Sequence, residues 1–171
     1  LYRGLDVNVL GVGGFTAAQL PMNLWGYVTS PPAGSASRYI FDDKSRFPIM
    51  TYAVLQFVKA EAAFKAGDKA TALTAYKNGV SAHLDFVNAR NLDNGQTPTQ
   101  MSAAEKAAFL ADPNIVPASA NSLTLSQIMT QKYIALYPWN TVEMWMDMRR
   151  YHYTDLDPST GKQVYPGYAL P

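Results

Sequence analysis

The spacing of apolar residues divides the chain into an irregular start, a helical middle and an irregular end. Residues 1–47 lack helical periodicity and are punctuated by glycine and proline, which indicates loop with short strand or helical pieces. Residues 48–151 carry apolar positions at the spacing of buried or amphipathic helices. Residues 152–171 form a second irregular segment, a tail that again contains proline and glycine. We therefore predict one structural domain, mainly α, with long irregular loops.

The first two predicted helices form a pair within residues 48–89. Pro48 suits the first position of a helix, and the apolar run that follows it ends at Gly67, a residue type that commonly follows a helix end. Apolar side chains cover nearly the whole circumference of this helix, so we expect burial on most of its sides. Asp68 can cap a second helix with a single apolar stripe. We expect the two helices to pack as a tight antiparallel pair.

Capping residues predict three further helices. They run from Ser102 to about Ala111, from Thr124 to about Tyr137, and from Asn140 to about Tyr151. Pro138 separates the last two because proline cannot continue a helix.

Two basic residues occupy helical faces that are otherwise apolar. Lys132 lies in the middle of the apolar face of its helix, and Arg149 lies one turn from Trp145, on whose ring it could stack. The face that carries Arg149 also contains Val142, Trp145 and Met146. The opposite face, which we predict to be solvated, contains Glu143, Asp147 and Arg150.

A carboxylate on the first helix could pair with one of these basic residues. Glu61 lies between apolar neighbours, where a carboxylate needs a cation or a hydrogen-bond donor. We predict that Lys132 or Arg149 meets Glu61 in a partly buried ion pair that pins the helices together. The alternative is that both basic side chains extend past their apolar neighbours to water.

Composition narrows the class of protein. The 171 residues suffice for one domain with a core, and 48% hydrophobic against 16% charged residues is apolar for a soluble chain. Fourteen Lys and Arg residues against 13 Asp and Glu residues argue against nucleic acid as a partner. The absence of cysteine excludes disulfides and thiolate chemistry, and no apolar run approaches the ~18 residues of a membrane span. The chain begins at Leu1 without a visible signal peptide, so we expect a fragment of a longer protein.

No arrangement of residues predicts catalysis, a metal site or a cofactor. The two histidines, His83 and His152, lack metal-ligand spacing, and His83 at the edge of an apolar stripe fits a packing role. Glu143 and Asp147 could act as an acid–base pair on a sugar, but Arg150 on the same face favours a solvated ion-pair surface. Calcium binding by the adjacent pair Asp42 and Asp43 has little support from further oxygen ligands.

The remaining candidates for recognition are aromatic. Trp25, Tyr27 and Tyr39 lie in irregular chain before the first helix, where flat rings could stack on the apolar face of a sugar. Packing of the same rings over the helices is the alternative.

Two linked segments resemble a known family. Residues 67–76 resemble the turn and second helix of a tetratricopeptide repeat. MTYAVLQFVKAEAAFKAGD and, further along, IMTQKYIALYPWNTVEMWMDMRRY resemble the C-terminal part of the SusD/RagB family. The matching residues are Tyr52, Ala53, Phe57, Ala60, Glu61, Ala62, Ile128, Gln131, Lys132, Ile134, Ala135, Leu136, Glu143, Trp145, Asp147, Arg149 and Arg150. Val54 departs from the family, which often has Glu there.

The resemblance implies a fold and a function. The fold is a right-handed stack of tetratricopeptide-like helix pairs, an α/α superhelix. The family consists of surface lipoproteins of the Bacteroidetes outer membrane that take part in polysaccharide utilisation. They bind glycans or other nutrients, without catalysis, over a TonB-dependent SusC-like transporter. We thus expect as partners that transporter, a glycan or other nutrient, and the missing N-terminal part of the same protein, with the lipid anchor in a part absent from this chain. The alternative is a helical tetratricopeptide-type adaptor that binds a protein or peptide.

Overall fold

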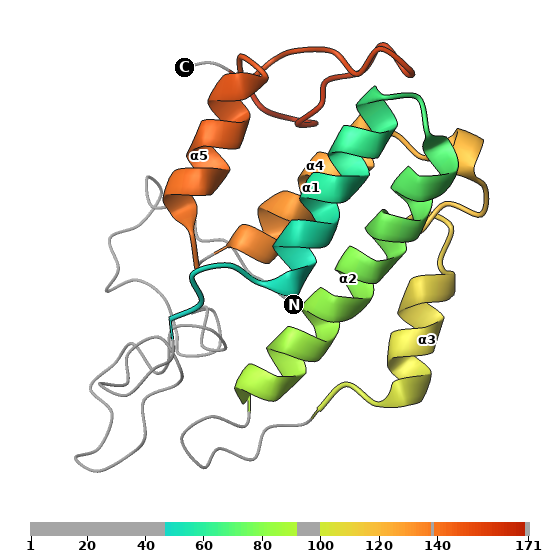
Figure 1. The fold of residues 1–171 in the computed structure, drawn as a ribbon, viewed down its shortest axis with the longest axis vertical. Coiled ribbons are helices and arrows are strands. Elements are labelled where there is room, and N and C mark those ends of the chain that lie inside the picture. The colour runs from blue at the N-terminus through green and yellow to red at the C-terminus, as the bar shows by residue number, and fades with distance from the viewer. Residues whose placement is uncertain (1–46, 92–99, 138, 170–171) are drawn as a thin grey trace, which may run out of the picture. The chain divides into compact units, whose positions relative to one another are not determined.

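The fold is mainly α in a computed structural model that describes residues 47–91, 100–137 and 139–169 (Figure 1). The elements in chain order are α1 (Tyr52–Lys65), α2 (Lys69–Asn91), α3 (Ala103–Ala111), the short 3-10 helix η3 (Ala120–Ser122), α4 (Leu125–Leu136) and α5 (Thr141–Arg150). The predicted fold class is confirmed. No helix in these ranges combines the length and apolar character that a membrane span requires.

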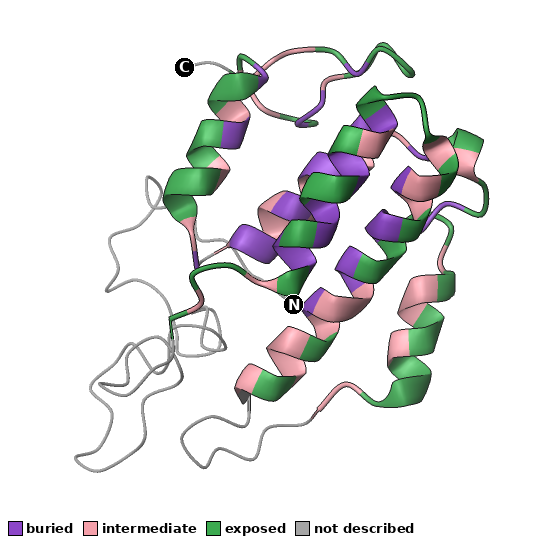
Figure 2. Ribbon diagram, in the orientation of Figure 1, coloured by how far each residue is buried: buried purple, intermediate pink, exposed green. Residues whose placement is uncertain are grey.

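The chain divides into two compact units, and the contacts described below lie within the unit made of residues 47–86 and 101–171. In Figure 1, α1 runs antiparallel to α2, and α4 lies behind α1. Helix α4 packs against both α1 and α5. Buried residues are concentrated on α1, α2 and α4, whereas α3 has none and α5 only one (Figure 2).

The turn between α1 and α2 forms as its sequence predicts. Gly67 adopts a left-handed φ of 83°, which an L side chain disfavours, and the Asp68 N–H then donates to the Ala63 carbonyl at 2.9 Å. The Asp68 carboxylate accepts from the Thr71 N–H at 3.0 Å and so caps α2.

The start of α1 differs from the expectation. The helix begins at Tyr52 and not at Pro48, because the extended Thr51 is the N-cap and its side chain accepts from the Val54 N–H at 3.2 Å. The expected burial on most sides is also wrong, since Tyr52, Leu55 and Val58 are exposed. Only one side of α1 therefore faces the core.

Helices α1 and α2 meet closely at Phe57. This ring is fully buried and lies edge-on to Tyr76, with 6.1 Å between the ring centroids. A Cβ atom at Gly79 would lie 2.8 Å from a ring carbon of Phe57, so a glycine is needed for this approach. The Tyr76 hydroxyl donates to the Ile115 carbonyl at 2.6 Å, which ties α2 to the segment after α3.

The later helices begin at the predicted residues. Ser102 and Thr124 form capping boxes with Glu105 and Gln127, and Asn140 accepts from the Glu143 N–H at 3.1 Å.

The tail after α5 is irregular, as predicted, but it is anchored to α4 through Asp157. This carboxylate is fully buried and accepts from the Ser126 N–H at 3.2 Å, at the first turn of α4. It also accepts from the N–H and the hydroxyl of Ser159 at 2.8 and 2.6 Å. Asp157 therefore fixes the tail across the start of α4, a contact that the sequence did not reveal.

Candidate functional site

Four charged side chains from three helices form what we call the ion network: Glu61, Lys132, Asp147 and Arg150. The Lys132 Nζ lies 2.6 Å from Asp147 Oδ2, and the Arg150 Nη2 lies 2.6 Å from Asp147 Oδ1. Arg150 also makes a bidentate contact with Glu61, with Nη2 at 3.0 Å from Oε2 and Nη1 on Oε1. Glu61, Lys132 and Asp147 are buried, while Arg150 reaches solvent.

Glu61 receives further donors at the edge of the ion network. The Tyr151 hydroxyl donates to Oε1, and the Lys65 Nζ lies 3.2 Å from the same oxygen. Burial by itself would raise the pKa of Glu61, but the hydrogen bonds from Arg150 and Tyr151 outweigh it and lower that pKa to about 2. The contact with Glu61 correspondingly raises the pKa of Arg150. The pair is therefore ionised at neutral pH.

The predicted partners of Glu61 are wrong in the structure. Lys132 pairs with Asp147, and Glu61 pairs with Arg150 and Lys65. Arg149 instead places its guanidinium 4.8 Å from the centroid of the Trp145 ring, as the stacking option anticipated. The helices are pinned by ion pairs, but through other residues than expected.

The predicted orientation of α5 is also wrong. Trp145 and Met146 are each 49% exposed, whereas Asp147 is 5% exposed and Met144 and Met148 pack partly buried against the core. The inward stripe follows the spacing of one helix face, with Met144, Asp147, Met148 and Tyr151. The physical reason is the buried Lys132, which needs a carboxylate from α5.

The ion network leaves no acid–base pair at Glu143 and Asp147. Glu143 is exposed, and Asp147 is buried against Lys132, so the two carboxylates do not share a site. His83 is 7% exposed, and this burial lowers the pKa of its ring to about 4, which fits the predicted packing role. No cluster of three or more potential metal-ligating side chains occurs in the ranges that the structure describes.

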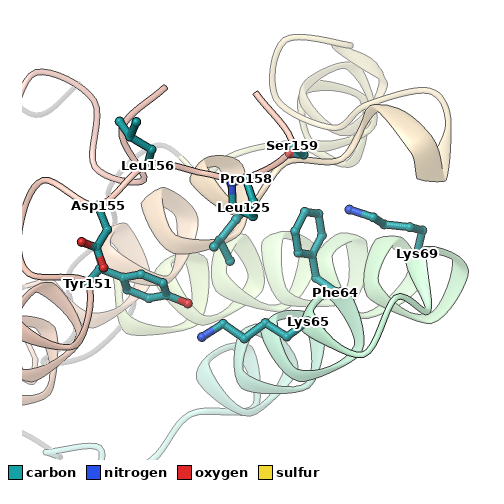
Figure 3. Close-up of a pocket in the computed structure, with 9 residues that line it drawn as sticks. All are labelled: Phe64, Lys65, Lys69, Leu125, Tyr151, Asp155, Leu156, Pro158 and Ser159. Carbon is teal, nitrogen blue, oxygen red and sulfur yellow. The ribbon is translucent and has the colours of Figure 1, made fainter. Parts of the chain in front are cut away.

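A separate hollow of about 730 Å³ lies beside the ion network (Figure 3). It is bounded by the end of α1, the starts of α2 and α4, and the tail. The lining side chains are Phe64, Lys65, Lys69, Leu125, Tyr151, Asp155, Leu156, Pro158 and Ser159. The sequence did not predict this hollow, because its lining comes from four separate segments.

The charged side chains of the lining are two lysines and one aspartate, Asp155. In Figure 3, Lys65 and Lys69 lie on the α1–α2 side, across from Leu156 and Pro158. The Lys69 Nζ lies 3.1 Å from the centroid of the Phe64 ring. Partial burial lowers the pKa of Lys69, and Asp157 opposes this effect.

The predicted aromatic binding residues Trp25, Tyr27 and Tyr39 lie outside the described residues, as do Asp42 and Asp43. They remain predictions from the sequence.

Comparison with known proteins gives one family match. A protein family described as "Starch-binding associating with outer membrane" matches residues 8–166. This range includes the ion network, the hollow and the predicted aromatic residues. No curated protein and no solved structure matches the chain.

Proposed function

Because this chain belongs to the SusD-like family, we propose that it binds glycans or other nutrients at the cell surface and delivers them to a TonB-dependent SusC-like transporter. The family match over residues 8–166 carries this proposal. We place the protein at the outer membrane, exposed to the medium and held there by a lipid anchor. The transporter and the glycan are its proposed partners.

Binding without turnover fits the chemistry of the described residues. Asp147, which the sequence spacing placed on one helix face with Glu143, is held by Lys132 and Arg150. This carboxylate is 5% exposed and both of its oxygens contact cations, so it does not face a substrate. We therefore propose capture and hand-over of the ligand, with no chemical step.

Trp25, Tyr27 and Tyr39 are the proposed ligand contacts, through stacking on sugar rings. We expect Trp25→Ala to lose glycan binding while the fold is retained, because stacking uses the ring and not the backbone. A glycan array on the intact protein identifies the ligand, calorimetric titration then measures the loss, and circular dichroism checks the fold.

Trp145→Ala is the matched control, since Trp145 is half-exposed and packs against Arg149. Unchanged binding by Trp25→Ala would return Trp25 to a packing role. Turnover of a sugar by the wild-type protein would contradict the non-enzymatic proposal.

A tetratricopeptide-type adaptor for a protein or peptide is the second candidate. The observation that favours it is the exposed apolar side of α1, with Tyr52, Leu55 and Val58. Binding to peptides but to no glycan on the array would favour this alternative over the first proposal.

A further inference from the structure

The two lysines of the hollow differ in whether a carboxylate pairs with the ammonium group. The Lys65 Nζ lies 3.2 Å from Glu61 Oε1 and 4.7 Å from the centroid of the Tyr151 ring. Its charge is therefore matched by a carboxylate. The Lys69 Nζ lies over the Phe64 ring, and within the described ranges no carboxylate comes within 4.0 Å of it.

The acid that acts electrostatically on Lys69 cannot move toward it. Asp157 is fully buried, and its two oxygens accept hydrogen bonds from Ser126 and Ser159. Lys69 thus presents an ammonium group at the wall of the hollow with its charge available to an anion.

The rest of the lining suits a sugar ring. Leu156 and Pro158 are exposed and supply apolar surface, while Asp155, whose Oδ2 lies 3.0 Å from the Nδ1 of His152, supplies a hydrogen-bond acceptor through its other oxygen. Apolar surface beside polar groups that converge on one place is typical of a site for a small molecule. The hollow of about 730 Å³ has room for such a ligand.

We propose that this hollow binds an acidic sugar residue, with its carboxylate on Lys69, its ring against Leu156 and Pro158, and a hydroxyl donating to Asp155. This inference rests on the proposed function, because it names a class of glycan that the protein would bind. It places that class at a site distinct from the predicted aromatic residues.

The test is calorimetric titration of the intact protein with a hexamer of galacturonic acid, its carboxyl-reduced counterpart and maltohexaose. We expect Lys69→Gln to weaken binding of the acidic hexamer about 10-fold or more, since a charge-assisted hydrogen bond is lost. Lys69→Arg retains binding, because the positive charge remains. Lys77→Gln is the matched control, an exposed lysine further along α2, and leaves the affinity unchanged.

The outcomes separate this inference from the proposed function. Wild-type binding to a neutral glycan but not to the acidic hexamer would overturn the acidic-sugar site and leave the proposed function standing. Equal affinities of wild type and Lys69→Gln for the acidic hexamer would also overturn the site, as would equal binding of the carboxyl-reduced hexamer. Absence of binding to every glycan on the array would overturn the proposed function and the site together.

Discussion

At the scale of single residues, Asp147 has the largest structural role in the ion network. Its two oxygens bind different cations, Lys132 of α4 and Arg150 of its own helix. Lys132 is only 3% exposed, so its ammonium has no access to water that could replace this carboxylate. Removal of the charge at Asp147 would leave the ammonium group of Lys132 buried and unpaired. The free-energy cost of that unpaired charge is far larger than the net stabilisation that an intact buried pair provides.

We expect Asp147→Asn to lower the free energy of unfolding by about 3 kcal/mol, the order found when one partner of a buried ion pair is removed. Urea denaturation followed by circular dichroism measures the change. Asp85→Asn is the control: Asp85 pairs with Lys106 at 2.6 Å but its side chain is 64% exposed, so its loss should cost below about 1 kcal/mol. Equal losses in the two variants would contradict the assigned role of Asp147.

The lowered pKa of Glu61 predicts a contribution to the free energy of unfolding that depends on pH in the acidic range. Its pKa is lowered from 4.5 to about 2 in the folded chain, so the unfolded state binds the proton more readily. The stabilisation is present above the unfolded pKa and is lost as pH falls from about 4.5 toward 2. We expect Glu61→Gln to flatten the dependence of the urea midpoint on pH in this window. Glu143→Gln, at an exposed position, should keep the wild-type slope.

At the scale of elements, sequence reasoning placed the helix ends well and the helix faces less well. Helix ends depend on local features, such as the capping hydroxyl of Thr124 and the positive φ of Gly67. Such features can be predicted from the residue type at a single position. The inward face of α5 depends on a distant residue. Apolar side chains occur on both sides of this helix, and the larger Trp145 suggested the wrong one. The residue that indicates the inward face of α5 is Lys132 of α4, because its buried ammonium pairs with the Asp147 carboxylate of α5.

The α1–α2 contact gives a prediction for two glycines. We expect Gly79→Ala to cost about 1–3 kcal/mol, because the new methyl would overlap the buried Phe57 ring. Gly67→Ala has open space around the new Cβ and should cost only about 1–2 kcal/mol through its left-handed φ. Thermal unfolding of both variants measures the difference. Ala75→Gly, a substitution in α2 like that at Gly79, is the comparison for a change of helix propensity. It is expected to cost about 1 kcal/mol, through the lower helix propensity of glycine and the loss of a buried methyl group. A neutral Gly79→Ala would show that Phe57 can move.

At the scale of the whole molecule, the sequence predicted the mainly α class and the family, because both depend on periodic and linked motifs along the chain. It could not predict the hollow or the Asp157 anchor, since each joins segments that are far apart in sequence. The aromatic residues that the sequence predicts as ligand contacts lie outside the described residues.

The ion network also determines which substitutions at its positions the fold can tolerate. Replacement of Asp147 by an uncharged residue would strand the buried ammonium of Lys132, whereas replacement of Glu61 would leave Arg150 paired with Asp147 and in contact with solvent. Replacement of Asp147 and Lys132 together by apolar residues can be nearly neutral. A single uncharged replacement at Asp147 is therefore costly, and a simultaneous replacement of Lys132 reduces that cost. Because residues 132 and 147 lie in different helices, the effect of a substitution at one of them depends on the residue present at the other.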